Sequence, residues 1–242
     1  MTKTNTDTSD FTLYPNIYCA LDTTDMDHAA DLARAMQSCG CGIKLGLEFF
    51  NANGPDGIAR IKDRYPDLSL FIDLKYHDIP NTVAGAVRAI SKLEPDYINV
   101  HALGGADMMK AAKDAIKSDK TKLLAVTLLT SMSDKDAQDI GLPHAIADHV
   151  TALARLTDKA GLDGVVCSAA ELLQLTPELR DDFIYMVPGI RPAGSATDDQ
   201  QRVMTPYMAL KNGATHLVIG RPITQHSNPE QAAREIMATL QG

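Results

Sequence analysis

The chain has 242 residues, of which 45% are apolar, and this composition is typical of a soluble globular protein. Its formal net charge of -8 makes a nucleic-acid backbone an unsuitable partner, so we expect no nucleic-acid binding. The longest apolar runs, such as residues 123–129, are too short to span a bilayer, and we expect no membrane partner.

The N-terminus and the cysteines predict a cytoplasmic protein. Residues 1–10 are polar and lack the positively charged start and apolar run of a signal peptide. The four cysteines form no C-x-x-C pair, and we interpret them as reduced thiols of the cytosol. We expect residues 1–13 to form a flexible tail and residues 14–242 to form one catalytic domain.

From residue 17 onward, short apolar runs alternate with helical patterns. The runs predict strands at residues 17–21, 42–46, 70–75, 97–100, 123–128, 164–167, 183–187 and 216–219. The patterns after them predict helices at residues 26–38, 57–64, 82–93, 106–116, 145–160, 169–175, 205–212 and 229–240. Most of the strands are continuous apolar runs, which suits a parallel sheet that is buried on both faces.

Eight strand–helix units in a chain of about 250 residues are typical of the (β/α)8 TIM barrel, an α/β fold that here forms a single domain. A doubly wound sheet is the alternative, but no G-x-G-x-x-G follows the first strand. In a TIM barrel the active site lies at the C-terminal ends of the strands. Polar residues at those positions form two groups, and the fourth strand ends with Asn99 and His101, of which we expect His101 to have a packing or supporting role.

The first group is an alternation of charges. Asp73 and Lys75 lie two apart on one strand and therefore share a face, and Asp78 lies on the loop beyond. Asp22 ends the first strand and Lys44 lies on the second. At about 4 Å and an effective dielectric near 20, each opposite pair is worth roughly 4 kcal/mol. The alternation thus keeps the carboxylates ionised and holds an ammonium proton at a fixed point.

The second group is Arg191, Gly220 and Arg221, which follow the last two strands. This is the usual phosphate position in TIM barrels, and Gly220 allows close approach of the backbone. Residues 188–203 form a long polar segment. We expect this segment to act as a lid that excludes water and strengthens the electrostatics inside.

Several motifs, taken in chain order, resemble those of the bacterial members of the orotidine 5′-phosphate decarboxylase family. The central one is D-L-K-Y-H-D-I-P-N-T-V at residues 73–83. The others are A-L-D at 20–22, K-L-G at 44–46, L-T-S at 129–131, P-G-I-R-P at 188–192, D-Q at 199–200 and V-I-G-R-P at 218–222. The resemblance spans nearly the whole chain, and the combination is highly specific.

The resemblance implies decarboxylation of orotidine 5′-phosphate to UMP and CO2, the last step of de novo pyrimidine nucleotide synthesis. It implies no metal and no organic cofactor. Lys75 would protonate a carbanion at C6 of the pyrimidine, and Asp73 would lie beside the departing carboxylate. Lys44 and Asp78 would complete the alternation of charges, with Asp78 reaching into the partner's active site of a homodimer.

The resemblance also implies the substrate contacts. Asp22 and Lys44 would bind the ribose, with Thr82 of the partner subunit nearby, and Thr130 and Ser131 would lie near the base. The phosphate would be held after the last two strands and by the lid. The implied substrate-binding residues are Asp22, Lys44, Asp73, Ile79, Thr82, Thr130, Ser131, Pro188, Arg191, Gln200, Gly220 and Arg221.

Other interpretations of the same residues stay open. Taken alone, Asp73 and Lys75 are as consistent with a structural ion pair as with a catalytic one. His77 and His101 are consistent with packing roles. A related barrel enzyme acting on a sugar phosphate is the second candidate function, either a magnesium-dependent keto-gulonate-phosphate decarboxylase or a pentose-phosphate epimerase. A non-catalytic barrel that senses a nucleotide is the third, since the fold alone does not decide function.

Overall fold

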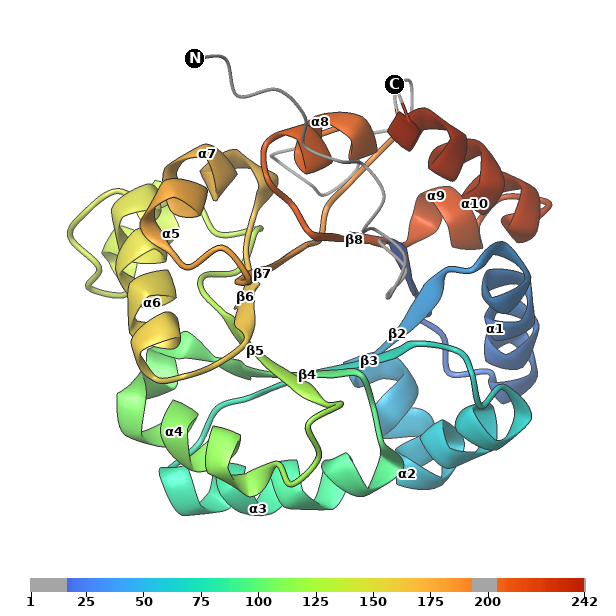
Figure 1. The fold of residues 1–242 in the computed structure, drawn as a ribbon, viewed down its shortest axis with the longest axis horizontal. Coiled ribbons are helices and arrows are strands. Elements are labelled where there is room, and N and C mark those ends of the chain that lie inside the picture. Colours follow the sequence, from blue (N-terminus) through green and yellow to red (C-terminus); the bar gives the residue numbers. More distant parts are fainter. Residues whose placement is uncertain (1–16, 193–203, 242) are drawn as a thin grey trace, which may run out of the picture.

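The computed structural model describes residues 17–192 and 204–241. In this part of the chain, eight parallel strands close into a barrel in the order β1 to β8, with β1 paired to both β2 and β8. Figure 1 looks along the barrel and shows the helices outside the strands. The predicted TIM barrel is confirmed, and the closed sheet excludes the doubly wound alternative. The predicted tail at residues 1–13 and Gln200 lie outside the described residues.

The strands match their predicted positions to within two residues. They are nearly continuous runs of buried residues, because their inner face fills the barrel and their outer face packs against helices. The strands are β1 (Ile17–Ala20), β2 (Gly42–Gly46), β3 (Leu70–Tyr76), β4 (Tyr97–His101), β5 (Lys122–Val126), β6 (Gly164–Val166), β7 (Ile184–Val187) and β8 (His216–Ile219).

Helices follow the strands as predicted, with Asp25 capping the first of them by accepting two backbone N–H groups. No helix in the described ranges is long and apolar enough to cross a membrane. The predicted helices are α1 (Met26–Cys39), α2 (Leu47–Arg64), α3 (Pro80–Ile90), α4 (Gly105–Ala115), α6 (Ile146–Lys159), α7 (Leu172–Leu175), α8 (Pro206–Lys211) and α10 (Pro229–Ala238). Several continue into or follow single 3-10 turns, such as Ser91–Leu93 after α3.

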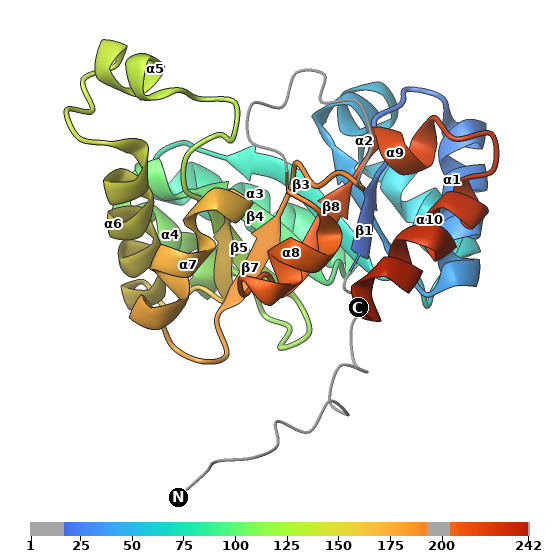
Figure 2. The same cartoon turned by 90° about the horizontal axis from the view of Figure 1, so that it is seen from above.

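Three helical segments differ from the prediction. The helix expected at residues 57–64 begins at Leu47, because the chain kinks at Gly54 (φ 62°) and resumes at Pro55 instead of stopping there. Two short helices, α5 (Asp134–Asp139) and α9 (Arg221–Thr224), lie outside the eight predicted strand–helix units, since neither is long enough to produce a periodic pattern. In Figure 2, α5 stands above the rest of the described chain.

The interior of the barrel is built in layers. Tyr18, Phe71 and Tyr97 pack edge to face at ring distances of 5.6 to 6.4 Å and form an aromatic layer. Gly42 makes room for this layer, because a Cβ atom there would come within 2.5 Å of the Tyr18 ring. Two residues further along β2, β3 and β4, the same interior face carries polar side chains instead. The aromatic layer of Tyr18, Phe71 and Tyr97 therefore lies beneath a polar layer, and we call it the aromatic floor.

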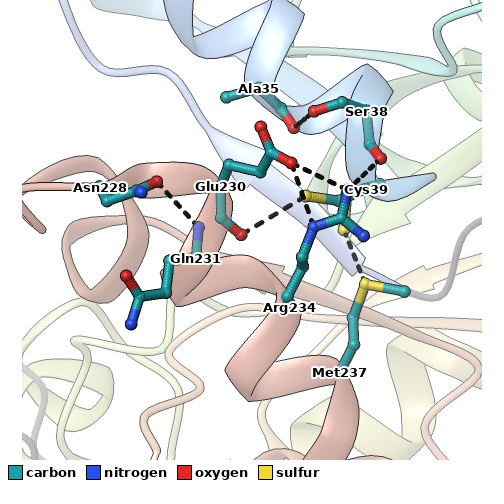
Figure 3. Close-up of polar contacts among 9 residues, drawn as sticks. Ala35, Ser38, Cys39, Asn228, Glu230, Gln231, Arg234 and Met237 are labelled. Carbon is teal, nitrogen blue, oxygen red and sulfur yellow. Dashed lines mark hydrogen bonds and ion pairs between the residues drawn. The ribbon is translucent and has the colours of Figure 1, made fainter.

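The last helix closes the ring of helices by packing on the first, and Figure 3 shows this contact between α10 and the end of α1. The guanidinium of Arg234 donates to the carbonyl of Ser38 at 2.7 Å and pairs with Glu230 at 2.9 Å. Cys39 lies beside them, with its thiol 3.5 Å from the carbonyl oxygen of Glu230. All four cysteines are free and buried, in line with the predicted reduced thiols, while the cytoplasmic location itself stays a prediction.

Candidate active site

The predicted alternation of charges forms at the C-terminal ends of β1, β2 and β3. Asp73 lies in its centre, with Oδ2 3.2 Å from the Nζ of Lys44 and Oδ1 2.6 Å from the Nζ of Lys75. Lys44 also approaches Oδ1 of Asp22 at 3.6 Å. We call Asp22, Lys44, Asp73 and Lys75 the charged row. Its inner members are buried, whereas 58% of the Asp22 side chain is exposed.

Each charge in the row is stabilised by its neighbours. Burial alone would raise the pKa of Asp73, but the adjacent Lys44 and Lys75, together with hydrogen bonds from Lys75 and Asn99, lower it to about 2. Burial likewise opposes the charged form of Lys44, yet Asp73 and Asp22 outweigh it and raise the pKa of this lysine. Asp73 and Lys44 are therefore both charged at neutral pH.

The backbone at Lys75 is unusual. Its φ angle is 50°, which lies in the left-handed region that residues other than glycine seldom adopt. Its N–H donates to Oδ1 of Asn99 at 2.8 Å, and the amide of Asn99 donates to Oδ1 of Asp73 at 2.7 Å. No role was predicted for Asn99, although a polar residue inside the apolar run of β4 was a usable signal. Strained backbone of this kind is concentrated at functional sites.

Asp78 does not join the charged row within this chain. Its Oδ1 accepts the N–H of Ile79 at 2.6 Å, and none of the ion pairs among the described residues includes it. Ile79 is 66% exposed, and Thr82 is exposed in the first turn of α3. This segment, residues 78–82, thus faces outward from the barrel that carries it.

The residues predicted to bind the phosphate lie at neighbouring strand ends. Arg191 follows β7 and is buried, with its Nη1 donating to the carbonyl of Ile190 at 3.1 Å. Gly220 and Arg221 follow β8, which pairs with β7, so the structure brings these residues to the same side of the barrel. Gln200, the predicted lid contact, lies outside the described residues.

The remaining predicted contacts also lie at C-terminal strand ends. Pro188 directly follows β7, and Thr130 and Ser131 form part of the turn after β5. The rings of His77 and His101 lie 5.5 Å apart beside the charged row. Burial and the neighbouring His77 and Lys75 lower the pKa of His101. Among the described residues, no three or more His, Cys, Asp or Glu side chains are placed to hold a metal ion.

Comparison with known proteins identifies the family. The family model described as orotidine 5′-phosphate decarboxylase / HUMPS matches residues 15–236. The chain belongs to this family. An orotidine 5′-phosphate decarboxylase of Rhodospirillum rubrum is 50% identical over 233 residues, which cover 93% of this chain and 94% of that protein. That of Idiomarina loihiensis is 48% identical, with 93% of this chain and 98% of that protein covered.

Solved structures of the orotidine 5′-phosphate decarboxylase family agree with this assignment. The crystal structure of the enzyme from Lactobacillus acidophilus matches with a TM-score of 0.83 and 36% identity, covering 95% of this chain and all of that one. The predicted enzyme class, a carboxy-lyase of the orotidine 5′-phosphate decarboxylase family, is confirmed.

Proposed function

We propose that this protein converts orotidine 5′-phosphate to UMP and CO2, and that the charged row performs the chemistry. The observation that carries the proposal is the Lys75 ammonium, held 2.6 Å from an ionised Asp73 at the C-terminal end of the barrel. An ammonium fixed in a buried site is a preorganised cation and a proton source at one point in space. The close relatives with this name supply independent support.

The reaction breaks the bond between C6 of the pyrimidine and its carboxylate. The electron pair of this bond stays on C6, where no aligned π system delocalises it, and CO2 leaves. The ammonium of Lys75 stabilises the developing carbanion and then transfers its proton to C6, which gives UMP. Asp73 lies where it would repel the substrate carboxylate, which favours its departure. The proposal needs no metal and no organic cofactor.

Binding energy for this step comes from groups remote from C6. Arg191, Gly220 and Arg221 would hold the phosphate, with Gln200 on the lid, and Asp22 and Lys44 would hold the ribose. Thr130, Ser131 and Pro188 would border the base. Contacts with nonreacting parts of a substrate can be expressed at the reacting carbon when the site closes around it. Those of these residues that the structure describes lie after the C-terminal ends of barrel strands, which supports this division of roles.

The proposal includes a homodimer with shared active sites. Asp78, Ile79 and Thr82 are exposed at the start of α3, and none of the ion pairs among the described residues brings Asp78 to the row of its own chain. Exposed apolar residues in this loop and the next, Ile79 at 66% and Leu103 at 42%, suit a surface that a second copy covers. Asp78 would then place a second carboxylate at the partner's row, with Thr82 near the ribose.

The test is decarboxylation of orotidine 5′-phosphate, followed by ultraviolet absorbance with and without EDTA. We expect chelator-resistant turnover by the wild type and a loss of about 10⁴-fold or more in Lys75→Ala, since both a proton donor and a charge stabiliser are removed. Lys135→Ala is the matched control, because Lys135 is an exposed lysine paired only with Asp139 among the described ion pairs. It should retain full activity.

Absence of turnover by a folded wild-type protein would overturn the proposal. Turnover that EDTA abolishes would contradict the metal-free mechanism. Absence of turnover together with activity on a sugar phosphate in added magnesium would favour the magnesium-dependent sugar-phosphate decarboxylase. The matching family model is described as orotidine 5′-phosphate decarboxylase / HUMPS, so its members are not all orotidine 5′-phosphate decarboxylases, and the second candidate is therefore tested as well.

A further inference from the structure

The pairing of β3 with β4 is interrupted beside the charged row. Ile72 pairs with Ile98 and Tyr76 pairs with Val100, so the interval holds more residues on β3 than on β4. Such irregularities re-aim side chains and are frequent next to active sites. The left-handed residue, Lys75, lies inside this interval and is not paired with β4 in the ladder. Its N–H therefore needs another acceptor.

Asn99 fills the gap in the ladder. It lies on β4 between the two paired residues, and it is fully buried. Its Oδ1 accepts the Lys75 N–H at 2.8 Å and its Nδ2 donates to Asp73 Oδ1 at 2.7 Å. The orientation of the amide is fixed by chemistry, because a backbone N–H only donates and a carboxylate only accepts.

We propose that Asn99 is a positioning residue for the decarboxylation: it ties the strained backbone of Lys75 to the carboxylate of Asp73 and so holds the ammonium and the carboxylate in register. Two of its bonds end on the two residues whose charged atoms are 2.6 Å apart. The same carboxylate oxygen, Asp73 Oδ1, accepts from both Asn99 and Lys75. The inference rests on the proposed function, because it assigns Asn99 a part in the same chemistry.

Few side chains can replace this amide. Aspartate has nearly the same shape but offers no donor, so Asn99→Asp would place a second carboxylate at 2.7 Å from Asp73 Oδ1. Two carboxylates this close share a proton, and the apparent pKa of the pair rises. Serine keeps a hydroxyl but is too short to span both partners. These two variants break the link in different ways and give different kinetic signatures.

The experiment measures kcat and KM for orotidine 5′-phosphate against pH, with the affinity for UMP from calorimetry. For Asn99→Asp we expect a fall in kcat of about tenfold or more at pH 7. We also expect the acid limb, the fall of kcat on the acidic side of its pH profile, to move to higher pH by about one pH unit or more. Asn99→Ser should lower kcat by a similar factor with the acid limb unmoved. In both variants UMP affinity should stay within about threefold, since the phosphate and ribose contacts are intact.

Tyr97→Phe is the matched control. Tyr97 lies two residues earlier on β4, is buried on the same interior face and hydrogen-bonds His216 at 3.1 Å. Its loss should reduce stability while leaving kcat and the acid limb as in the wild type. A purely structural role for Asn99 would give the same pattern in the Asn99 variants.

Wild-type kcat in either folded Asn99 variant, or an unmoved acid limb in Asn99→Asp, would overturn the inference. If Asn99→Asp does not fold, the kcat of Asn99→Ser decides alone, since retained turnover there contradicts a positioning role. An inactive wild type would instead refute the proposed function, so the two failures are distinguishable.

Discussion

Of two titratable residues in the barrel interior, the surroundings keep one ionised and the other neutral. Asp73 is ionised, because its cationic and amide partners outweigh burial and lower its pKa to about 2. Among the described residues no charged partner offsets the burial of His216, which lowers its pKa to about 4, so it is neutral at pH 7. The first belongs to the proposed chemistry. The second belongs to the aromatic floor, where its ring nitrogens lie 3.1 Å from the Tyr97 hydroxyl and 2.8 Å from the Thr215 hydroxyl.

The burial of neutral His216 predicts an acid-sensitive stability. In the unfolded chain the imidazole takes up its proton near pH 6.5, whereas in the folded state it does so only near pH 4. The free energy of unfolding should therefore be fully present above pH 6.5 and should fall as the pH drops toward 4, by about 3 kcal/mol at most. The check is denaturant unfolding of the wild type and His216→Gln across this range.

Subtracting one stability curve from the other isolates the contribution of the histidine from that of the carboxylates that titrate at low pH. The difference should slope between pH 6.5 and 4. Parallel curves for wild type and His216→Gln would refute this account of the floor.

At the scale of the elements, two glycines allow the cost of overpacking to be distinguished from the entropic cost of a glycine within a helix. Gly42→Ala on β2 would put a Cβ atom 2.5 Å from the Tyr18 ring, and we expect a loss of about 1–3 kcal/mol in unfolding free energy from overpacking. Gly85→Ala on α3 is the matched contrast, because its new Cβ would meet nothing closer than an Arg88 nitrogen at 4.0 Å. It should gain about 0.5–1 kcal/mol. Chemical unfolding of both variants tests this, and equal effects of the same sign would contradict it.

The strands and the charged row could be predicted because both depend on local patterns. Strands buried on both faces appear as apolar runs, and residues two apart on a strand share a face, which placed Asp73 beside Lys75. The first turns of α2, before the kink at Gly54, were not predicted, because Gly54 and Pro55 are residues that usually separate helices and strands. The role of Asn99 depends on the interrupted pairing of β3 and β4, a relation between strands that no local pattern contains.

At the scale of the whole molecule, the proposed dimer predicts complementation between two inactive variants. Lys75→Ala lacks the proton donor, and Asp78→Asn lacks the carboxylate offered to the partner. A hybrid dimer would hold one intact site, built from Lys75 of one subunit and Asp78 of the other. Equal mixing with subunit exchange should restore about one quarter of wild-type activity, because about half of the dimers are hybrids with one good site of two.

The control for complementation pairs Lys75→Ala with Asp73→Asn. These residues lie on the same strand of the same subunit, so every hybrid site lacks one of them, and mixing should restore nothing. Recovery in this control, or none with Asp78→Asn, would contradict the shared site.

The proposed function depends on one step above all, the transfer of a proton between Lys75 and C6 of the pyrimidine. The most direct measurement follows the C6 hydrogen of UMP by proton NMR in heavy water, with UMP binding verified by calorimetry. The wild type should replace this hydrogen with deuterium faster than free UMP does, and Lys75→Ala should bind UMP without accelerating the exchange. Exchange by Lys75→Ala at the wild-type rate would contradict this step.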